Sequence, residues 1–218
     1  TINTFEYIVR FTKKLIIMDA HLNKRTTRLI SHLREHFEVE AHAYVNKYNP
    51  SYNTKYYFMP KNILYALIYQ KLDENKKIII MTNSLKESTE LYSYVKSYKK
   101  DLKIQIYNSR TLQSKKNKHF NDVNTYWKKY DCVICSPTVS AGVSFEVEHF
   151  DYVFGSFSSN SCNVETCKQM LGRVRNIKED TIYLSISAIS RAEDEYPTNP
   201  NQIKEHLRYH REKLIKNA

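Results

Sequence analysis

The stretch "KKIIIMTNSLKESTELYSYVKSYKKDLKIQIYNS" (residues 76–109) decides the fold class. It begins with an apolar run of strand length. Residues 84–100 then repeat apolar side chains at helical spacing, and residues 102–109 form a second strand-like run. A parallel pair of strands needs a crossover of about a dozen residues or more, which is usually a helix. The stretch therefore predicts a strand, helix and strand of one parallel sheet.

The same alternation continues on both sides of this unit. Helices are predicted at 62–72, around Met170 and, as a basic tail, at 201–218. Further strands are predicted at 131–136, 150–157 and 181–187. Strands that alternate with helices favour an α/β fold with a mostly parallel sheet and helices packed on it.

The first sixty residues carry different signals. The run "FTKKLIIMDAHLN" (11–23) predicts a buried strand that ends at Asp19. The next run, "KRTTRLISHLREHF" (24–37), predicts a helix, since apolar residues recur every fourth position from Leu29. A turn signal and a tyrosine-rich strand follow, up to Pro60, and are typical of a connection between units.

Composition places the chain among globular proteins that bind polyanions. Of its 218 residues 41% are hydrophobic and 26% are charged. No apolar run approaches the roughly 20 residues of a bilayer span, so no membrane association is expected. The net charge of +11 attracts phosphate backbones, which makes nucleic acid the expected partner. The first residues show neither an initiator Met nor a signal pattern, so we expect a part of a longer polypeptide.

The four cysteines have spacings that resemble a zinc site. Cys132 and Cys135 form a C-x-x-C pair, and Cys162 and Cys167 are separated by four residues. The first pair lies in a predicted strand, where residues three apart point to opposite faces. We therefore expect buried, reduced thiols and no metal site.

Small polar side chains follow three successive predicted strands. In a parallel sheet these strand ends meet at one edge, where ligands of α/β proteins bind. Hydroxyls and amides at such an edge can bind phosphate oxygens without reading sequence, but helix capping is the alternative for each of them. The residues are Thr82, Asn83, Ser84, Asn108, Ser109, Ser136, Thr138, Ser140 and Ser144, with Gly142 among the last.

The stretch "CKQMLGRVRN" (167–176) places two arginines directly after a glycine. A glycine lets the backbone approach a ligand closely. An arginine at the γ-phosphate of a nucleotide stabilises charge in the transition state. A surface salt bridge from Arg173 or Arg175 to Glu179 or Asp180 is the alternative.

Three of these stretches, in this order, resemble motifs of the second RecA-like lobe of superfamily 2 helicases. "KKIIIMTNSLKES" (76–88) resembles motif IV, "SPTVSAGVSFE" (136–146) motif V and "QMLGRVR" (169–175) motif VI. The last two are similar to the herpesvirus-type replication origin-binding helicases of large DNA viruses. "LIIMDAHLN" (15–23) resembles a segment near the end of the first lobe in that family.

The resemblance implies a RecA-like three-layer domain and a role for each site residue. Gln169, Arg173 and Arg175 would face ATP, with one arginine as the finger, and Gly142, Ser144 and Gly172 would contact the nucleotide or couple it to the strand. Thr82, Asn83, Ser84, Asn108, Ser109, Ser136 and Thr138 would lie along the nucleic acid. The two arginines are two apart where many superfamily 2 helicases space them by three, so which is the finger stays open. Ser144 replaces an Asp common in the superfamily, which puts a direct metal or ribose contact there in doubt.

The resemblance also implies the organisation and the function of the chain. Residues 1–60 would be the end of a first motor lobe and a connection, 61–190 the second lobe, and 191–218 a helical extension. No G-x-x-x-x-G-K-[ST] loop occurs, and "DAHL" at Asp19 lacks the second carboxylate of a magnesium-binding motif. ATP and Mg would thus be held mainly by the first lobe of the same polypeptide, and this chain alone would not hydrolyse ATP.

The expected activity is that of an ATP-dependent DNA helicase in viral replication, inside the infected cell. Single-stranded or duplex DNA, the first motor lobe and other replication proteins would be its partners. An RNA helicase or translocase of the same superfamily, or a non-enzymatic nucleic-acid-binding module, is the alternative.

Overall fold

The computed structural model describes residues 2–18, 24–35, 42, 44, 53–139, 142–159, 161–187 and 199–216. The chain divides into two units, 1–50 and 51–218, which are considered separately. The second unit contains the stretches that resemble motifs IV, V and VI, whereas residues 15–23 belong to the first unit.

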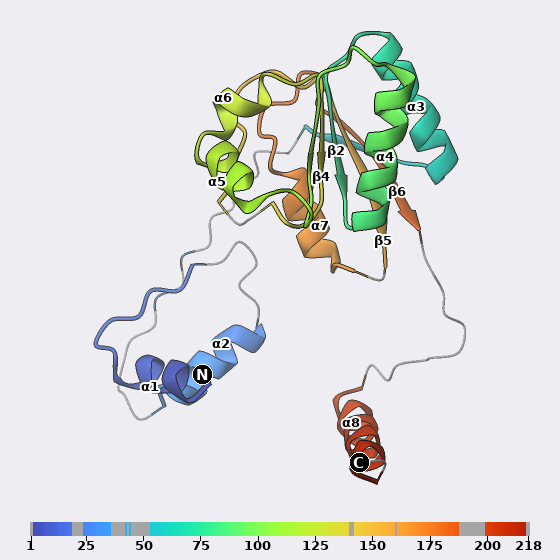
Figure 1. The fold of residues 1–218 in the computed structure, drawn as a ribbon. Coiled ribbons are helices and arrows are strands. Elements are labelled where there is room, and N and C mark those ends of the chain that lie inside the picture. Colours follow the sequence, from blue (N-terminus) through green and yellow to red (C-terminus); the bar gives the residue numbers. More distant parts are fainter. Residues whose placement is uncertain are drawn as a thin grey trace. The chain divides into compact units, whose positions relative to one another are not determined.

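The second unit is built on a six-stranded sheet with the order β1-β6-β5-β2-β4-β3. Its strands β2, β4, β5 and β6 are labelled in Figure 1. Every neighbouring pair is parallel, which confirms the predicted sheet. The strands are β1 (Lys55–Phe58), β2 (Ile78–Thr82), β3 (Ile104–Tyr107), β4 (Cys132–Cys135), β5 (Tyr152–Ser158) and β6 (Thr181–Ser187). The central strands β2 and β4 are buried along their whole length, because helices cover both of their faces.

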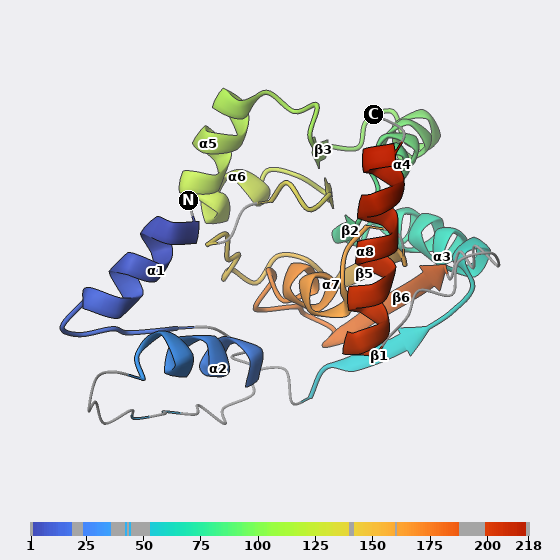
Figure 2. The same ribbon diagram turned by 90° about the horizontal axis from the view of Figure 1, so that it is seen from below.

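Helices form a layer on each face of the sheet, as Figures 1 and 2 show. On one face lie α3 (Lys61–Asp73) and α4 (Leu85–Tyr98), which bury Leu64, Ile68, Leu91 and Val95 against it. On the other face lie α5 (Gln113–Asn121), α6 (Val123–Trp127) and α7 (Val164–Leu171). The domain is therefore the RecA-like three-layer α/β fold that the sequence predicts.

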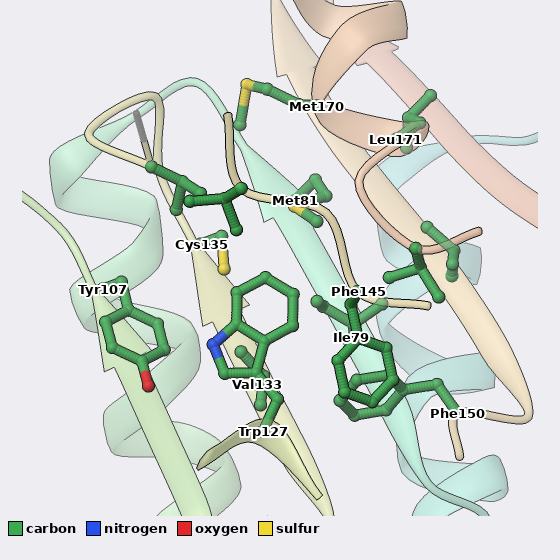
Figure 3. Close-up of a cluster of buried hydrophobic side chains, with 14 of the residues drawn as sticks. Ile79, Met81, Tyr107, Trp127, Val133, Cys135, Phe145, Phe150, Met170 and Leu171 are labelled. Carbon is green, nitrogen blue, oxygen red and sulfur yellow. The ribbon is translucent and has the colours of Figure 1, made fainter. Parts of the chain in front are cut away.

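Each face of the sheet has its own apolar cluster, because strand side chains alternate between faces. Ile79, Met81 and Cys135 belong to the cluster under α6 and α7, where Figure 3 shows Trp127 lying beside them. Cys132 belongs to the opposite cluster. The prediction that Cys132 and Cys135 point to opposite faces is thus confirmed, and both thiols are buried and free.

The predicted strand at 11–23 is wrong for the residues that the structure describes. Helix α1 (Ile2–Phe11) occupies its start, and residues 12–18 form no strand. The side chains of Ile16 and Met18 are 69% and 89% exposed. An apolar run becomes a strand only where a neighbour accepts its backbone hydrogen bonds, and no described strand pairs with this one. Asp19 lies outside the described residues.

The remaining predicted elements in the described part of the chain are helices and strands as expected. They include α2 (Lys24–Leu33), the tyrosine-rich strand β1, and α8 (Pro200–Lys216) in the basic tail. β1 pairs with β6, so the connecting segment contributes the edge strand of the sheet. Helices α5 and α6 were not predicted. None of the described helices is both long enough and apolar enough to cross a bilayer.

Candidate functional site

The sheet brings the small polar residues that follow its strands to one edge, which is called the rim below. β2, β4 and β3 are parallel neighbours, so the loops that follow them leave from the same side. Residues 82–84, 108–109 and 136–138 stand at these three strand ends. Some of these side chains form hydrogen bonds inside the protein, whereas others are exposed to solvent.

Asn83 and Ser84, in the motif IV loop (residues 82–88), use their side chains inside the protein. The Asn83 amide donates to the Ser158 carbonyl at 2.6 Å and accepts from the Ser158 N–H at 3.0 Å, which extends the pairing of β2 with β5. Ser84 is the N-cap of α4, where its Oγ accepts from the Glu87 N–H at 3.2 Å. The capping alternative therefore describes Ser84.

Thr82 takes part in a buried network around the Glu87 carboxylate. Its hydroxyl donates to Glu87 Oε2 at 3.2 Å. The other oxygen, Oε1, accepts from the Tyr65 hydroxyl at 2.6 Å, from Lys61 Nζ at 2.9 Å and from the Ser156 hydroxyl. Burial favours a higher pKa of Glu87, but these hydrogen bonds and the Lys61 charge outweigh it, so the pKa is lowered. An ionised Glu87 thus fixes the start of α4.

Asn108 and Ser109 follow β3 and differ in exposure. Asn108 is buried; its Oδ1 accepts from the Arg110 N–H at 3.0 Å, and its Nδ2 donates to Ser88 Oγ at 3.3 Å. It shapes the turn in the manner of an Asx turn. Ser109 is exposed to solvent at the same edge.

The motif V loop opens onto a pocket of about 270 Å³. Ser136 is buried and lies 3.3 Å, oxygen to oxygen, from Thr138. Gly142 has φ +96°, a backbone conformation that favours glycine, and a Cβ there would meet no atom within 4 Å. The pocket is lined by Thr138, Gly142 and Val143, and on α5 by Gln113, Asn117, Phe120 and Asn121.

The α5 residues of this pocket were missed by the sequence interpretation. The amides of residues 113–121 ("QSKKNKHFN") come one residue after the polar strand end "IYNSRT" (106–111). This proximity is the signal that could have found them. The helix was missed because few apolar side chains mark its buried face, which is formed in part by Lys116 and His119.

Motifs V and VI are joined by their backbones. Phe145 and Val174 form a parallel bridge. The Phe145 N–H donates to the Arg173 carbonyl at 2.7 Å, and the Arg175 N–H donates to the Phe145 carbonyl at 2.9 Å. Both bridging side chains are buried in the cluster under α7. A shift of one loop must therefore move the other.

The two arginines of motif VI have different environments. Arg173 Nη1 donates to the Val143 carbonyl at 3.1 Å, and its buried Nε has no partner among the described residues. Burial, and then the charge of Arg175, lower the pKa of Arg173. Arg175 is exposed, and its Nε donates to Ser144 Oγ at 3.2 Å. Within the part of the chain that the structure describes, neither arginine is paired with a carboxylate, so the salt-bridge alternative does not account for them.

Gln169 and Gly172 complete the predicted nucleotide side. Gln169 is exposed on α7, and Gly172 caps that helix, donating its N–H to the Lys168 carbonyl at 3.0 Å. A Cβ on Gly172 would lie 3.5 Å from that carbonyl oxygen, which is an ordinary contact. The fold itself therefore does not require glycine at 172, in contrast to Gly142.

The parallel three-layer fold and the joined motif V and VI loops define the class of this domain. It is a second RecA-like lobe of the superfamily 2 helicase type. Residues 59–203 match the family described as origin of replication binding protein, and the chain belongs to that family.

Relatives extend far beyond this domain. The chain is 38% identical over 178 residues to a putative helicase/primase complex protein of African swine fever virus, covering 81% of this chain and 17% of that protein. It is 24% identical over 189 residues to the replication origin-binding protein of human herpesvirus 7, covering 83% and 23%. The chain thus spans about a fifth of the length of these relatives.

A solved structure has the same fold. S. cerevisiae Dbp5 bound to RNA and ADP BeF3 matches with a TM-score of 0.55 and 12% identity, over 95% of this chain and 52% of that one. At this identity the likeness concerns the fold alone. It agrees with the RecA-like architecture described above.

Proposed function

We propose that this chain is the second motor lobe of an ATP-dependent DNA helicase that acts where viral DNA is replicated in the infected cell. Its family supports this role, and so do the descriptions of relatives as a helicase/primase complex protein and a replication origin-binding protein. The observation that carries the proposal is the Phe145–Val174 bridge, because it links a loop on the strand side to a loop on the nucleotide side.

On the nucleotide side, Arg175 is the arginine finger. Its guanidinium is exposed, and among the described residues only the Ser144 hydroxyl holds it, so it can turn to a phosphate, which binds arginine more strongly than a hydroxyl does. Arg173 is a positioning residue, since its bond to the Val143 carbonyl ties motif VI to motif V. Gln169, with Gly172 beside it, faces the nucleotide from the end of α7.

The residues present fit a polyphosphate but not its metal. Two guanidinium groups without carboxylate partners among the described residues suit an anion. No described group of three His, Cys, Asp or Glu side chains could hold magnesium. In this proposal a first motor lobe, whose end lies in residues 1–60, binds Mg and ATP. Residues 61–190, completed by strand β1, form the second lobe, and 191–218 form an extension.

On the strand side, exposed groups of the rim contact the sugar–phosphate backbone. Ser109 and Gly142 are exposed and Thr138 is half-buried, and in this proposal Ser144 lies between the strand and Arg175. The side chains of Thr82, Asn83, Ser84, Asn108 and Ser136 hold the loops that the strand touches. Opening and closing of the cleft between lobes would then move the strand.

The test is ATP hydrolysis by the polypeptide that joins this lobe to its first lobe. Arg175→Ala should lower strand-stimulated turnover by about 10³-fold or more, because the finger stabilises transition-state charge. Arg175→Lys should not restore it, since lysine lacks the planar fork. Strand affinity should stay unchanged. Turnover near that of the wild type in Arg175→Ala would sink the assignment of the finger.

The same assay separates the alternatives. Stimulation by single-stranded RNA and not by DNA would favour an RNA helicase or translocase. Strand binding with no ATP turnover in the complete polypeptide would favour a non-enzymatic binding module.

A further inference from the structure

The pocket between α5 and the motif V loop differs in chemistry from the rest of the rim. It combines the Phe120 ring with the amides of Gln113, Asn117 and Asn121, next to Thr138 and Gly142. We propose that it binds one nucleobase, turned out of the strand that the lobe holds. The inference rests on the proposed function for its strand, but the pocket itself is defined by its side chains.

Phe120 supplies a stacking surface that is held in place. Its ring packs against Tyr107, with 5.0 Å between centroids, and its side chain is half-buried against the apolar cluster under α6 and α7. It also lines the pocket. A base stacks on an aromatic ring whatever its identity, because every base has a π face. An anchored ring loses little conformational entropy when a base binds.

The amides leave donors and acceptors for a base edge. Gln113 Nε2 donates to Asn117 Oδ1 at 2.8 Å, which uses one donor and one acceptor. Gln113 Oε1 and Asn117 Nδ2 remain, together with the exposed side chain of Asn121, which makes no hydrogen bond within the described part of the chain. Asparagine and glutamine pair with base edges through this combination of groups.

The size and charge of the pocket favour a base over a phosphate. Among the described residues that line it there is no lysine or arginine, so those residues offer an anion no counter-charge. Its volume of about 270 Å³ is slightly below the range of roughly 300–1,000 Å³ typical of drug-sized ligands. Gly142 keeps the motif V side open, since no side chain projects from it. A single base therefore suits the pocket better than a whole nucleotide.

The first arm of the test uses a ligand without phosphates. We expect 2-aminopurine riboside, at millimolar concentration, to shift the backbone NMR signals of Phe120, Gly142 and Val143 in the full 218-residue chain. Its fluorescence should fall on binding because the base stacks on Phe120. Phe120→Leu, which keeps an apolar side chain, should abolish both signals. Tyr94→Leu is the matched control, since Tyr94 is an exposed aromatic residue on α4 outside the pocket.

The second arm uses short oligodeoxynucleotides in which each position in turn is abasic. One position should lose affinity about 5- to 100-fold, the range expected for one base–aromatic stack. Phe120→Leu should lose a similar factor with the intact strand and nothing further with the abasic one, because both changes remove the same contact.

The outcomes distinguish the pocket from the proposed function. Equal affinity for intact and abasic strands, with no NMR shift from the riboside, overturns the base pocket and leaves strand binding in place. Failure to bind any oligonucleotide, with riboside shifts retained at Phe120 and Gly142, contradicts the proposed function and supports the pocket. If neither ligand binds, both proposals are wrong.

Discussion

The motif IV loop and the pocket beside the motif V loop lie at the same edge of one sheet and carry similar side chains, yet they are built differently. In the motif IV loop, the side chains of Asn83 and Glu87 form hydrogen bonds and an ion pair with other protein groups. In the pocket, Asn121 makes no hydrogen bond among the described residues, and no described atom lies within 4 Å of where a Cβ on Gly142 would stand. The difference indicates that the polar groups of the motif IV loop shape the rim, whereas those of the pocket are available for the nucleobase that we propose as its ligand.

The largest effect on stability is expected at Glu87 in the motif IV loop. Glu87→Ala should lower the free energy of unfolding by about 3 kcal/mol, because it leaves Thr82, Tyr65 and Ser156 without their buried acceptor. Urea denaturation of the 218-residue chain measures this. Glu90→Ala on the same helix is the matched control, since Glu90 is exposed and, in the described part of the chain, its only ion pair is with Lys86 at 3.9 Å. A loss of stability at Glu87 as small as that at Glu90 would contradict the structural role of the Glu87 network in the motif IV loop.

The same carboxylate should make stability depend on pH. The pKa of Glu87 in the folded chain is lowered from its ordinary value of 4.5. Its contribution to stability is therefore fully present above about pH 4.5 and is lost as the pH falls through the folded pKa. Glu87→Gln should flatten this part of the acid unfolding profile, whereas Glu90→Gln should leave it unchanged.

A comparison of two asparagines addresses the two regions directly. Asn83→Ala should cost about 2 kcal/mol, because it leaves both the N–H and the carbonyl of Ser158 without partners. Asn121→Ala in the open pocket should cost less than about 0.5 kcal/mol, as expected for an exposed side chain. Thermal unfolding of the two variants is the measurement. Equal losses would contradict the division.

The sequence predicts the sheet well because its strands are buried on both faces. Ile78–Thr82 and Cys132–Cys135 are short, almost wholly apolar runs, as is typical of central strands in a parallel sheet. Residues 15–18 (LIIM) are equally apolar but find no neighbour among the described strands, so local pattern alone misassigned them.

The roles of the rim residues were harder to predict, for a physical reason. Whether the Asn83 amide is occupied inside the protein depends on Ser158, which lies 75 residues further along the chain. Sequence spacing identifies amides at strand ends, but not the partner that each one meets across the sheet. For the same reason the spacing of Arg173 and Arg175 could not show that one lies against the Val143 carbonyl and the other is exposed.

A small effect on stability is expected at Ser109, which lies outside the pocket but at the same edge of the sheet, at the end of β3. Ser109 is an exposed serine at the carboxyl edge of the sheet, so Ser109→Ala should change the free energy of unfolding by less than about 0.5 kcal/mol. If its hydroxyl binds a phosphate oxygen, affinity for single-stranded DNA should fall about 2- to 10-fold, the value of one hydrogen bond. Ser97→Ala is the matched control, because Ser97 is exposed near the C-terminal end of α4 and its Oγ donates to the Tyr94 carbonyl, its one hydrogen-bond partner among the described residues. A fall in affinity for both variants would indicate a general effect of the surface, whereas no fall at Ser109 would move the strand away from the β3 end of the rim.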